Sequence, residues 1–559
     1  MIEQTYPSGR VVKNVLDNNG DLNIVQSKKN ANFGFHNYAK NFTYNSAGAV
    51  TSMQLGNGRW ESTQFNSRLQ PTQIALGATT GASDLLRLDY SYGETNNNGN
   101  VLSQTITVPT VGVNTGFTAV QSYSYDSLNR IKDATENITP IGGSSSQSWK
   151  QTFTYDRYGN RNFDEANTTT LIKNCGTTPN FTVCAADRKV LNPEILASNN
   201  RIKGDQDGDS INDYVFDAAG NTTRDAQNRR FTYDAENKQI KVETVDGNGD
   251  PVATVGEYVY DGDGKRIKKI VPNGESVIFV YDAGGNLIAE YANQISQTPQ
   301  VSYLTNDHLG SPRINTDAAG NIIARHDYHP FGEEIIGTGG RTQGLNYTAD
   351  DVRKQFTGYE RDDETDLDFA EARYLGSVLG RYTTPDRYGN NIIRTNDLQM
   401  RKYIGQPQNW NQYSYCNNNP LKYIDKDGNH PILALIAAAE AGGSINLRSG
   451  RNTATLPRSN RPGSVRNTGQ QGGRGGSGKP REHFRQSKSK KEARDRSRNG
   501  RHDQPHKSRT SRGQREHFHN KNNRGENIHE TFGKAKNRLR PGEPQRKRPV
   551  RNNPYLAPQ

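Results

Sequence analysis

A short motif recurs along the first 300 residues of this chain and constrains its fold more than any other feature. Each copy has two aromatic residues separated by one residue, then Asp or Asn, then a turn rich in Gly and Asn. The seven copies are FTYNSAGAV from Phe42, YSYDSLNRI from Tyr123, FTYDRYGNR from Phe153, YVFDAAGNTT from Tyr214, FTYDAENKQI from Phe231, YVYDGDGKRI from Tyr258 and FVYDAGGNLI from Phe279. Alternating aromatic positions are typical of a strand, and the following residues suit a tight turn with positive φ. Each copy is therefore predicted to be a β-hairpin.

A single hairpin is too small to bury its aromatic face, so the copies are expected to stack edge to edge. Only 31% of the residues are hydrophobic, which fits an architecture that buries little per residue. The 27 Tyr suit pleated, half-buried surfaces. The alternative for such a composition is a disordered chain with Tyr-rich segments, but seven copies in register with their turns argue against it.

The charge of the chain is divided unevenly along its length. From Gly443 onward there are 30 Lys and Arg against 8 Asp and Glu, whereas the preceding part has 41 against 51. The basic end suggests a polyanionic partner. Between Ala441 and Lys479 the chain is rich in Gly, Ser, Arg and Asn, which is typical of a flexible linker.

Several features bear on export. The first twenty residues lack the apolar run of a signal peptide, and the longest apolar run, ILALIAAAEA, is too short to span a bilayer. Cys175 and Cys184 lie nine residues apart, so they are candidates for a local disulfide if the chain is exported.

The insertion DQDGDSINDY, residues 205–214, is a candidate calcium site. Its carboxylates alternate along the chain, and oxygen ligands at such spacing suit calcium. The loop departs from an EF-hand because its twelfth position is Phe216 instead of Glu. A solvated acidic turn is the alternative. The candidate ligands are Asp205, Asp207, Asp209 and Asp213.

Three further segments carry a family resemblance together with the hairpin motif. They are YLTNDHLGSPRINTDAAGNIIARHDYHPFGEE (303–334), FTGYERDDETDLDFAEARYLGSVLGRYTTPD (356–386) and YSYCNNNPLKYIDKDGN (413–429). The chain resembles Rhs and YD-repeat polymorphic toxins over about residues 1–430. The resemblance implies a mainly β fold, in which stacked YD-repeat hairpins form a partial, spiralling β-shell around a cargo. A flexible linker and a small basic α+β C-terminal domain are expected to follow.

The same resemblance predicts the domain organisation. The predicted parts are residues 1–300 as YD repeats, 301–430 as the Rhs repeat-associated core, 431–479 as the linker and 480–559 as a basic, His-rich toxin domain.

The resemblance also implies an aspartyl self-cleavage site at the end of the core, cutting near Asn429. The matching carboxylates are Asp386 and Asp425, with Arg373 as a structural or polarising partner. Two carboxylates that share a proton can activate water against a peptide bond. Both prolines of the family pattern are replaced here, by Arg387 and Lys426. We expect these cations to lower the pKa of the neighbouring carboxyls and so to hinder proton sharing. The alternative is that both Asp residues only organise turns.

The C-terminal end concentrates histidine, since six of the 11 His follow Gly442. In REHFHNKNNRGENIHETF, residues 515–532, two His flank Phe518, and alternate residues of a strand face the same side. A late His after an N-R-G-E turn is expected to return on a hairpin as a third ligand. Imidazoles suit metal binding or acid–base catalysis of phosphodiester hydrolysis. The candidate catalytic residues are His506, His517, His519, His529 and Glu530.

This end resembles the His-rich tips of bacterial polymorphic toxins, several of which are HNH-like nucleases. The resemblance implies a nuclease with a candidate divalent metal, a cognate immunity protein, and a secreted or cell-surface shell that delivers the toxin domain into a target cell. Glycans and secretion-system components are further candidate partners. The alternatives are a disordered basic tail and, for the whole chain, a YD-repeat scaffold or adhesin without catalysis. Residues expected to hold the nucleic-acid backbone are Lys490, Lys491, Arg494, Arg498, Arg512 and Arg515.

Overall fold

The first part of the chain forms an extended antiparallel sheet in the computed structural model. The structure describes residues 3–171, 185–272, 274–293, 301–387, 401, 405–429, 432–433, 445–449, 452–455, 483–487, 506–510, 513–521 and 527–536. Within them, each of the first 13 strands pairs with the next along the chain. These strands are β1 (Glu3–Thr5), β2 (Val11–Leu16), β3 (Leu22–Lys28), β4 (His36–Tyr44), β5 (Val50–Leu55), β6 (Trp60–Phe65), β7 (Pro71–Gly77), β8 (Leu86–Ser91), β9 (Ser103–Val108), β10 (Phe117–Tyr125), β11 (Ile131–Pro140), β12 (Ser146–Tyr155) and β13 (Arg161–Phe163).

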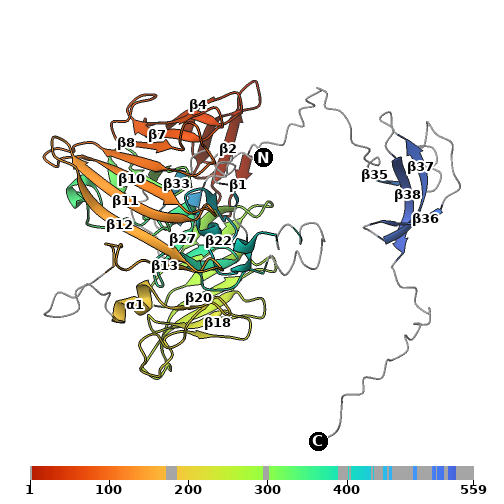
Figure 1. Cartoon of the computed structure of the whole chain (residues 1–559). Helices are drawn as coiled ribbons and strands as arrows, with labels where there is room; N and C mark the ends of the chain where they lie inside the picture. Colours follow the sequence, from red (N-terminus) through yellow and green to blue (C-terminus); the bar gives the residue numbers. More distant parts are fainter. Residues whose placement is uncertain are drawn as a thin grey trace, which may run out of the picture. The chain divides into compact units, whose positions relative to one another are not determined.

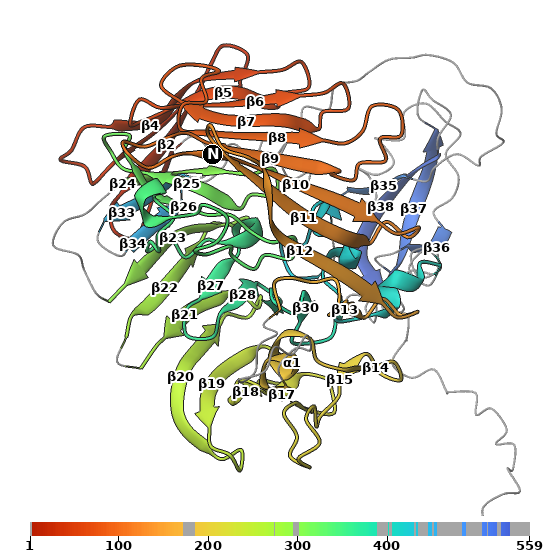
Figure 2. The same cartoon turned by 60° about the vertical axis from the view of Figure 1, so that its left-hand side comes forward.

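A second antiparallel sheet of eight described strands repeats the same next-neighbour order. It is preceded by the helix α1 (Ala185–Leu191) and the pair β14 (Ile195–Leu196) and β15 (Arg201–Ile202). Its strands are β16 (Val215–Phe216), β17 (Thr222–Asp225), β18 (Arg229–Tyr233), β19 (Gln239–Val245), β20 (Pro251–Tyr260), β21 (Arg266–Ile270), β22 (Ser276–Tyr281) and β23 (Leu287–Ala292). The prediction of a mainly β fold built from stacked hairpins is confirmed, and the curved sheets in Figures 1 and 2 are consistent with a partial β-shell.

The Asp of the recurring motif makes the hairpin turn. After β20, the backbone N–H of Asp261 donates to the Lys265 carbonyl, and Gly264 donates back to the Asp261 carbonyl. One carboxylate oxygen of Asp261 accepts the backbone N–H groups of Asp263 and Lys265 at 3.0 and 2.9 Å. Gly264 has φ +77°, a conformation that disfavours other side chains. The turn therefore uses a short acceptor side chain and a residue that adopts positive φ, which is Gly264 here and Asn237 in the preceding copy.

In six of the seven copies a Tyr precedes that Asp or Asn and ties its hairpin to an earlier strand; the copy from Tyr214 has Phe216 there. The Tyr260 hydroxyl donates to the Gln239 carbonyl at 2.8 Å, and that of Tyr155 donates to the Ile131 carbonyl at 2.6 Å. The same contact recurs from Tyr44 to Leu22, Tyr125 to Val101, Tyr233 to Thr222 and Tyr281 to Arg266. The motif thus joins a turn signal to a tether between successive hairpins, which explains why Tyr and Asp occur together.

The segment from residue 301 to 429 is built from shorter elements. They are β24 (Val301–Asn306), β25 (Pro312–Thr316), β26 (Ile322–Arg325), β27 (Glu360–Asp362), β28 (Leu367–Ala370), β29 (Arg373–Gly376), β30 (Arg381–Tyr382) and β31 (Tyr423–Ile424), with 3₁₀ turns at Gln343–Leu345, Phe356–Gly358, Pro407–Trp410 and Cys416–Asn418. This segment packs on the first sheet, since Asn57 and Arg59 donate to the carbonyls of Asp317 and Gly320, both at 2.9 Å.

Three strands after residue 429 complete sheets of the preceding segment. They are β32 (Ile432–Leu433), β33 (Ile445–Ser449) and β34 (Asn452–Thr455). β32 pairs with β31, and β33 pairs with β24 in the order β26-β25-β24-β33-β34. β34 lies beside β23, at the end of the second sheet (Figure 2). Part of the range predicted as linker is therefore in strands.

Residues Gly463–Gln559 form a compact unit separate from Met1–Pro462. Its described elements are strands in the order β35-β38-β37-β36. They are β35 (His483–Ser487), β36 (His506–Thr510), β37 (Gly513–Lys521) and β38 (Asn527–Lys536). Among the described residues of the whole chain, no helix is long and apolar enough to cross a membrane.

Candidate functional sites

The predicted self-cleavage residues meet at the end of the core, around the guanidinium of Arg373. This buried side chain on β29 lies 3.0 Å from the carboxylate of Asp425, which follows β31. It also donates to the Gln412 carbonyl at 3.2 Å, and its Nε donates to the Gly428 carbonyl. One cation therefore contacts both the predicted carboxylate and a peptide bond beside Asn429.

Two tyrosines complete the surroundings of Asp425. The Tyr382 hydroxyl donates to the Asp425 carboxylate at 2.8 Å, and the Tyr359 hydroxyl donates to the Asp425 main-chain carbonyl. The Tyr382 ring also lies 3.6 Å beneath the Arg373 guanidinium. The sequence analysis missed both tyrosines and Gly428. Tyr382 stands in RYTTPD, only four residues before Asp386.

Burial dominates the protonation of Asp425. It raises the pKa of this carboxyl; the neighbouring Arg373 and Tyr382 lower it, and the charges of Asp427 and Asp386 raise it again. The expectation that Lys426 would lower the pKa of Asp425 below its usual value is wrong, because Lys426 is exposed and burial outweighs the local cation. A raised pKa favours the protonated acid that a shared-proton pair needs.

Asp386 lies at the rim of the same site. It is half-buried, and its backbone N–H donates to the Gln412 carbonyl at 2.8 Å, the carbonyl that also accepts from Arg373. The charges of Tyr382, Asp386 and Asp425 raise the pKa of Arg373 against the opposing effect of burial. Arg387 is exposed and donates to the Glu236 carbonyl. The structure thus brings Arg373, Asp386 and Asp425 into one electrostatic neighbourhood.

The four candidate catalytic histidines share one face of the C-terminal sheet. His506 on β36 lies directly opposite His517 on β37, and His519 lies directly opposite His529 on β38. Residues opposite each other, and residues two apart along a strand, occupy the same face. The four positions therefore form a continuous patch over three strands.

The other candidates in this unit divide between the faces. Arg515 precedes His517 by two residues and lies opposite Ser508, so its position is on the histidine face. Glu530 lies opposite Phe518, which puts its position on the other face. Candidates outside the described residues are Lys490, Lys491, Arg494, Arg498 and Arg512, as are Cys175 and Cys184.

The acidic insertion brings three of its four candidate ligands together. Ligand atoms of Asp205, Asp207 and Asp209 lie within 4.8 Å of one another. Asp213 instead pairs with Lys189 of α1 at 2.8 Å, and Lys189 also lies 3.2 Å from Asp207. Calcium binding stays a prediction, with Lys189 as a competing cation.

Comparisons with known proteins agree with the hairpin architecture. No protein-family model matches the chain. It is 27% identical over 341 residues to the tRNA nuclease WapA of Bacillus subtilis, covering 57% of this chain and 12% of WapA. It is 23% identical over 450 residues to the toxin subunit YenC1 of Yersinia entomophaga, covering 70% of this chain and 42% of YenC1. The chain thus spans less than half the length of either relative.

Solved toxin structures share the fold. The Photorhabdus luminescens Tc holotoxin pore aligns with a TM-score of 0.57 at 21% identity, over 77% of this chain and 21% of that chain. A chain of the TcdB2–TccC3 crystal structure aligns with a TM-score of 0.57 at 20% identity, over 76% of this chain and 21% of that one. The resemblance to Rhs and YD-repeat toxins is confirmed.

Proposed function

We propose that this chain is a polymorphic toxin whose β-shell carries a C-terminal, His-dependent nuclease. The observation that carries the proposal is the shared face of His506, His517, His519 and His529. Support comes from the +22 charge of the chain after Gly442, which suits a phosphate backbone, and from the WapA relatives, which are named as tRNA nucleases. Delivery into a competing cell and a cognate immunity protein belong to the same proposal.

The chemistry follows from imidazole at these positions. A neutral imidazole removes a proton from the attacking hydroxyl, and a protonated one gives a proton to the leaving oxygen. Arg515, at a position on the same face, would offset phosphate charge. A divalent metal held by the same imidazoles would supply an activated water. Glu530, at a position on the opposite face, is not needed for this arrangement.

The test uses the purified full-length chain with total tRNA and, separately, plasmid DNA. We expect hydrolysis of at least one substrate and a loss of about 10² or more in rate for the His517→Ala, His519→Ala double variant. The matched control is His36→Ala, an exposed histidine on β4. An EDTA arm separates metal-assisted from metal-free catalysis. The nuclease proposal fails if the wild-type chain leaves both substrates intact, or if the double variant matches it.

We also propose that the Arg373 site cleaves the chain at the Gly428–Asn429 bond. Asp386 takes a proton from water, the resulting hydroxide attacks the Gly428 carbonyl carbon, and Arg373 offsets the charge on the carbonyl oxygen. Protonated Asp425 then gives its proton to the departing Asn429 nitrogen. The raised pKa of Asp425 and the hydrogen bond from Arg373 Nε to Gly428 favour this assignment.

The cleavage test is expression of the full chain followed by denaturing electrophoresis and mass spectrometry. We expect two fragments from the wild type and one intact 62.2 kDa chain from Asp425→Asn and from Asp386→Asn. Asp246→Asn, in an exposed hairpin turn, is the control and should still be cut. A single intact band from the wild type would rule out the proposal.

A further inference from the structure

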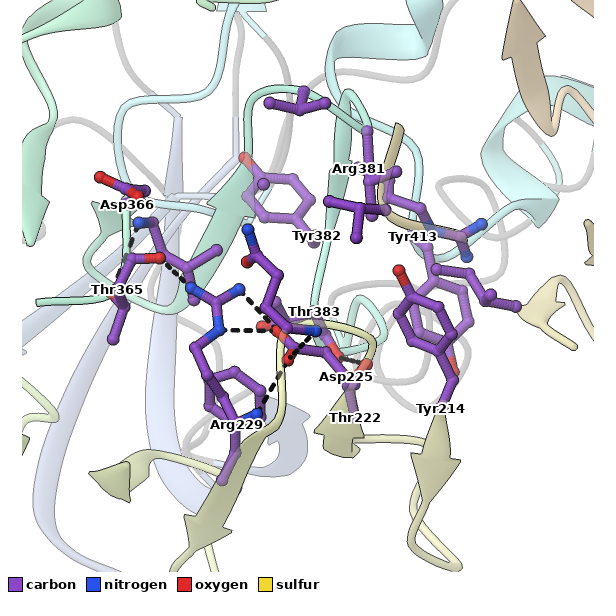
Figure 3. A pocket seen from close by; sticks show the side chains of 18 of the residues that line it. Tyr214, Thr222, Asp225, Arg229, Thr365, Asp366, Arg381, Tyr382, Thr383 and Tyr413 are labelled. Atoms are coloured by element: carbon purple, nitrogen blue, oxygen red, sulfur yellow. Dashed lines mark hydrogen bonds and ion pairs between the residues drawn. The ribbon is translucent and has the colours of Figure 1, made fainter. Parts of the chain in front are cut away.

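An open cavity of about 760 Å³ lies between the second sheet and residues 365–383 (Figure 3). Side chains from β16–β18 form one wall, and Tyr382 and Tyr413 belong to the other. Much of the lining is aromatic or aliphatic, including Tyr214, Phe216 and Phe231.

A smaller and more polar cavity of about 200 Å³ adjoins the first. The two share Leu379, Arg381 and Tyr413 in their walls. The remaining polar lining of the small cavity comes from Asn160, Arg161, Asn411, Ser414 and Asn418. Two guanidinium groups and no carboxylate line it.

Like the buried Arg325, these two arginines differ from Arg341 and Arg373 in their charged neighbours. Arg161 and Arg381 are each only 8% exposed, and neither lies within 4 Å of a carboxylate in the described part of the chain. By contrast, Arg341 contacts the carboxylates of Glu136 and Asp327, and Arg373 contacts the carboxylate of Asp425. The charges of Glu333 and Asp156 act on Arg161 and Arg381 from beyond ion-pair distance and only partly offset burial. An anion in direct contact with these buried cations would therefore be stabilised.

One N–H donor of these two guanidinium groups has no hydrogen-bond partner. Arg381 donates to the Asn200 carbonyl and lies 4.9 Å from the Tyr413 ring. Arg161 donates to the Val378 carbonyl at 2.7 Å, but its buried Nε has no hydrogen-bond partner. This Nε lies beside Gly380 in the wall of the small cavity, where an added Cβ would meet it at 3.0 Å. Burial lowers the pKa of both groups to about 10, which leaves both charged at neutral pH.

We propose that the two cavities form one binding site for a small organic carboxylate. Its carboxylate lies between Arg161 and Arg381, where charge-assisted hydrogen bonds satisfy the unused donor. Its apolar or aromatic body occupies the larger cavity, against Tyr214 and Phe231. This site shares one residue with the cleavage site. Tyr382 lines the large cavity with its ring and donates its hydroxyl to Asp425.

The test is isothermal titration calorimetry of the full chain with 4-phenylbutyrate. We expect saturable binding, with affinity at least 10-fold weaker for the neutral 4-phenylbutyramide and for inorganic sulfate. Arg381→Gln should weaken carboxylate binding at least 10-fold. Arg387→Gln, an exposed arginine outside both cavities, is the matched control and should bind as the wild type does.

A second variant is needed in case Arg381→Gln fails to fold, which the absence of a cooperative unfolding transition would show. This variant fills the cavity. Val378→Trp, at a half-buried position in the wall of the large cavity, should abolish binding while leaving both arginines in place. Equal affinities for the carboxylate and its amide, or no saturable heat with the wild type, would overturn the proposal. Equal binding of sulfate would also overturn it, by reducing the site to a plain anion site. The heat of binding is read whether or not the chain is cut, so the result is independent of self-cleavage.

Discussion

The 13-stranded sheet and the segment from residue 301 to 429 are stabilised in different ways. In the sheet, most of the fully buried side chains are apolar, such as Leu76, Leu88 and Ile106, with Glu136 as a charged exception. In the later segment, charged side chains are buried just as completely, among them Asp362 and Arg341. The sheet repeats one hairpin many times, whereas the later segment depends on contacts that each occur once.

The two kinds of stabilisation differ in how well they tolerate substitution. An apolar contact is non-directional, so a repeated hairpin can exchange one aliphatic residue for another with modest loss. A buried charge needs its own partner at hydrogen-bond distance, and its loss leaves the other charge unpaired. Both candidate sites of the core, the Arg373 centre and the Arg161–Arg381 cavity, lie where charges are buried. The repeats hold these charges in place.

The largest effect is expected from breaking a buried ion pair that joins the two regions. Arg341 contacts Glu136 of β11 at 2.7 Å and Asp327 at 2.7 Å, and neither Arg341 nor Glu136 is accessible to solvent. Arg341→Met should lower the free energy of unfolding by about 3–5 kcal/mol, because the buried Glu136 loses its cationic partner and Asp327 keeps only Arg313. Urea unfolding followed by tryptophan fluorescence measures it.

The control for this variant is an ion pair on the surface of the second sheet. Lys241 lies 2.7 Å from Glu243, and its side chain is 34% exposed. Lys241→Met should change the free energy of unfolding by less than about 1 kcal/mol. If both variants lose the same free energy of unfolding, the burial of charge does not explain the difference between the two regions.

A smaller effect is expected from pH. His326 lies 2.7 Å from Glu334 and 3.5 Å from Asp350. Burial lowers the pKa of His326, but these two carboxylates raise it to about 9. Since the folded pKa exceeds the unfolded value of about 6.5, the stabilisation is complete below about pH 6.5 and is lost as pH rises towards 9. The loss should reach about 3 kcal/mol.

Denaturant unfolding at several pH values between 6 and 9.5 measures this loss. His326→Gln should flatten the dependence, whereas His36→Gln, at an exposed position of the first sheet, should leave it unchanged. A wild-type stability that stays constant or rises over this interval would contradict the assignment.

A still smaller effect is expected inside the repeats. Tyr260→Phe removes the hydrogen bond to the Gln239 carbonyl and a longer one of 3.3 Å with the Tyr374 hydroxyl. It should lower the free energy of unfolding by about 1–2 kcal/mol. Tyr158→Phe, at a turn where the hydroxyl accepts a hydrogen bond from the exposed Arg157 side chain, should change it by less than about 0.5 kcal/mol. Equal values for the two would show that the tether between hairpins adds nothing to stability.

The smallest effect is expected at the acidic insertion. Addition of 1 mM calcium should raise the melting temperature by roughly 2 °C if the ion binds with millimolar affinity. The Asp205→Asn, Asp209→Asn double variant should not respond, and Asp246→Asn should respond as the wild type does. Lys189→Met should strengthen the response, because Lys189 competes at Asp207. An unresponsive wild type would leave the insertion as a solvated turn.

Local chemistry made much of this fold predictable. The aromatic alternation and the Asp, Asn and Gly of the turns act within about ten residues, so each hairpin could be placed from its own segment. The pairing of β24 with β33 could not, because no local pattern marks two strands about 140 residues apart as neighbours. The contact of Arg341 with Glu136, 205 residues away, has the same character.

The residues of the candidate sites also fall into those that local sequence identifies and those that only the fold identifies. Arg373, Asp386 and Asp425 could be named from motifs, as could the shared face of His517 and His519 from their spacing. Tyr359 and Tyr382 carried no signal, because the chain holds 27 Tyr and most motif tyrosines serve as tethers between hairpins. The alignment of His506 and His529 with the other two depends on strand register, which only the pairing shows.

The strands on either side of Asn429 have a consequence for the fate of a cut chain. Upstream β31 pairs with downstream β32, and upstream β24 pairs with downstream β33. A break between them would change covalent connectivity without separating the pieces, since the downstream piece would remain a strand of the upstream sheet. Departure of the cargo would then be governed by the opening of a backbone hydrogen-bond ladder. Peptide-bond cleavage would determine when the cargo can leave, and separation of the paired strands would determine whether it leaves.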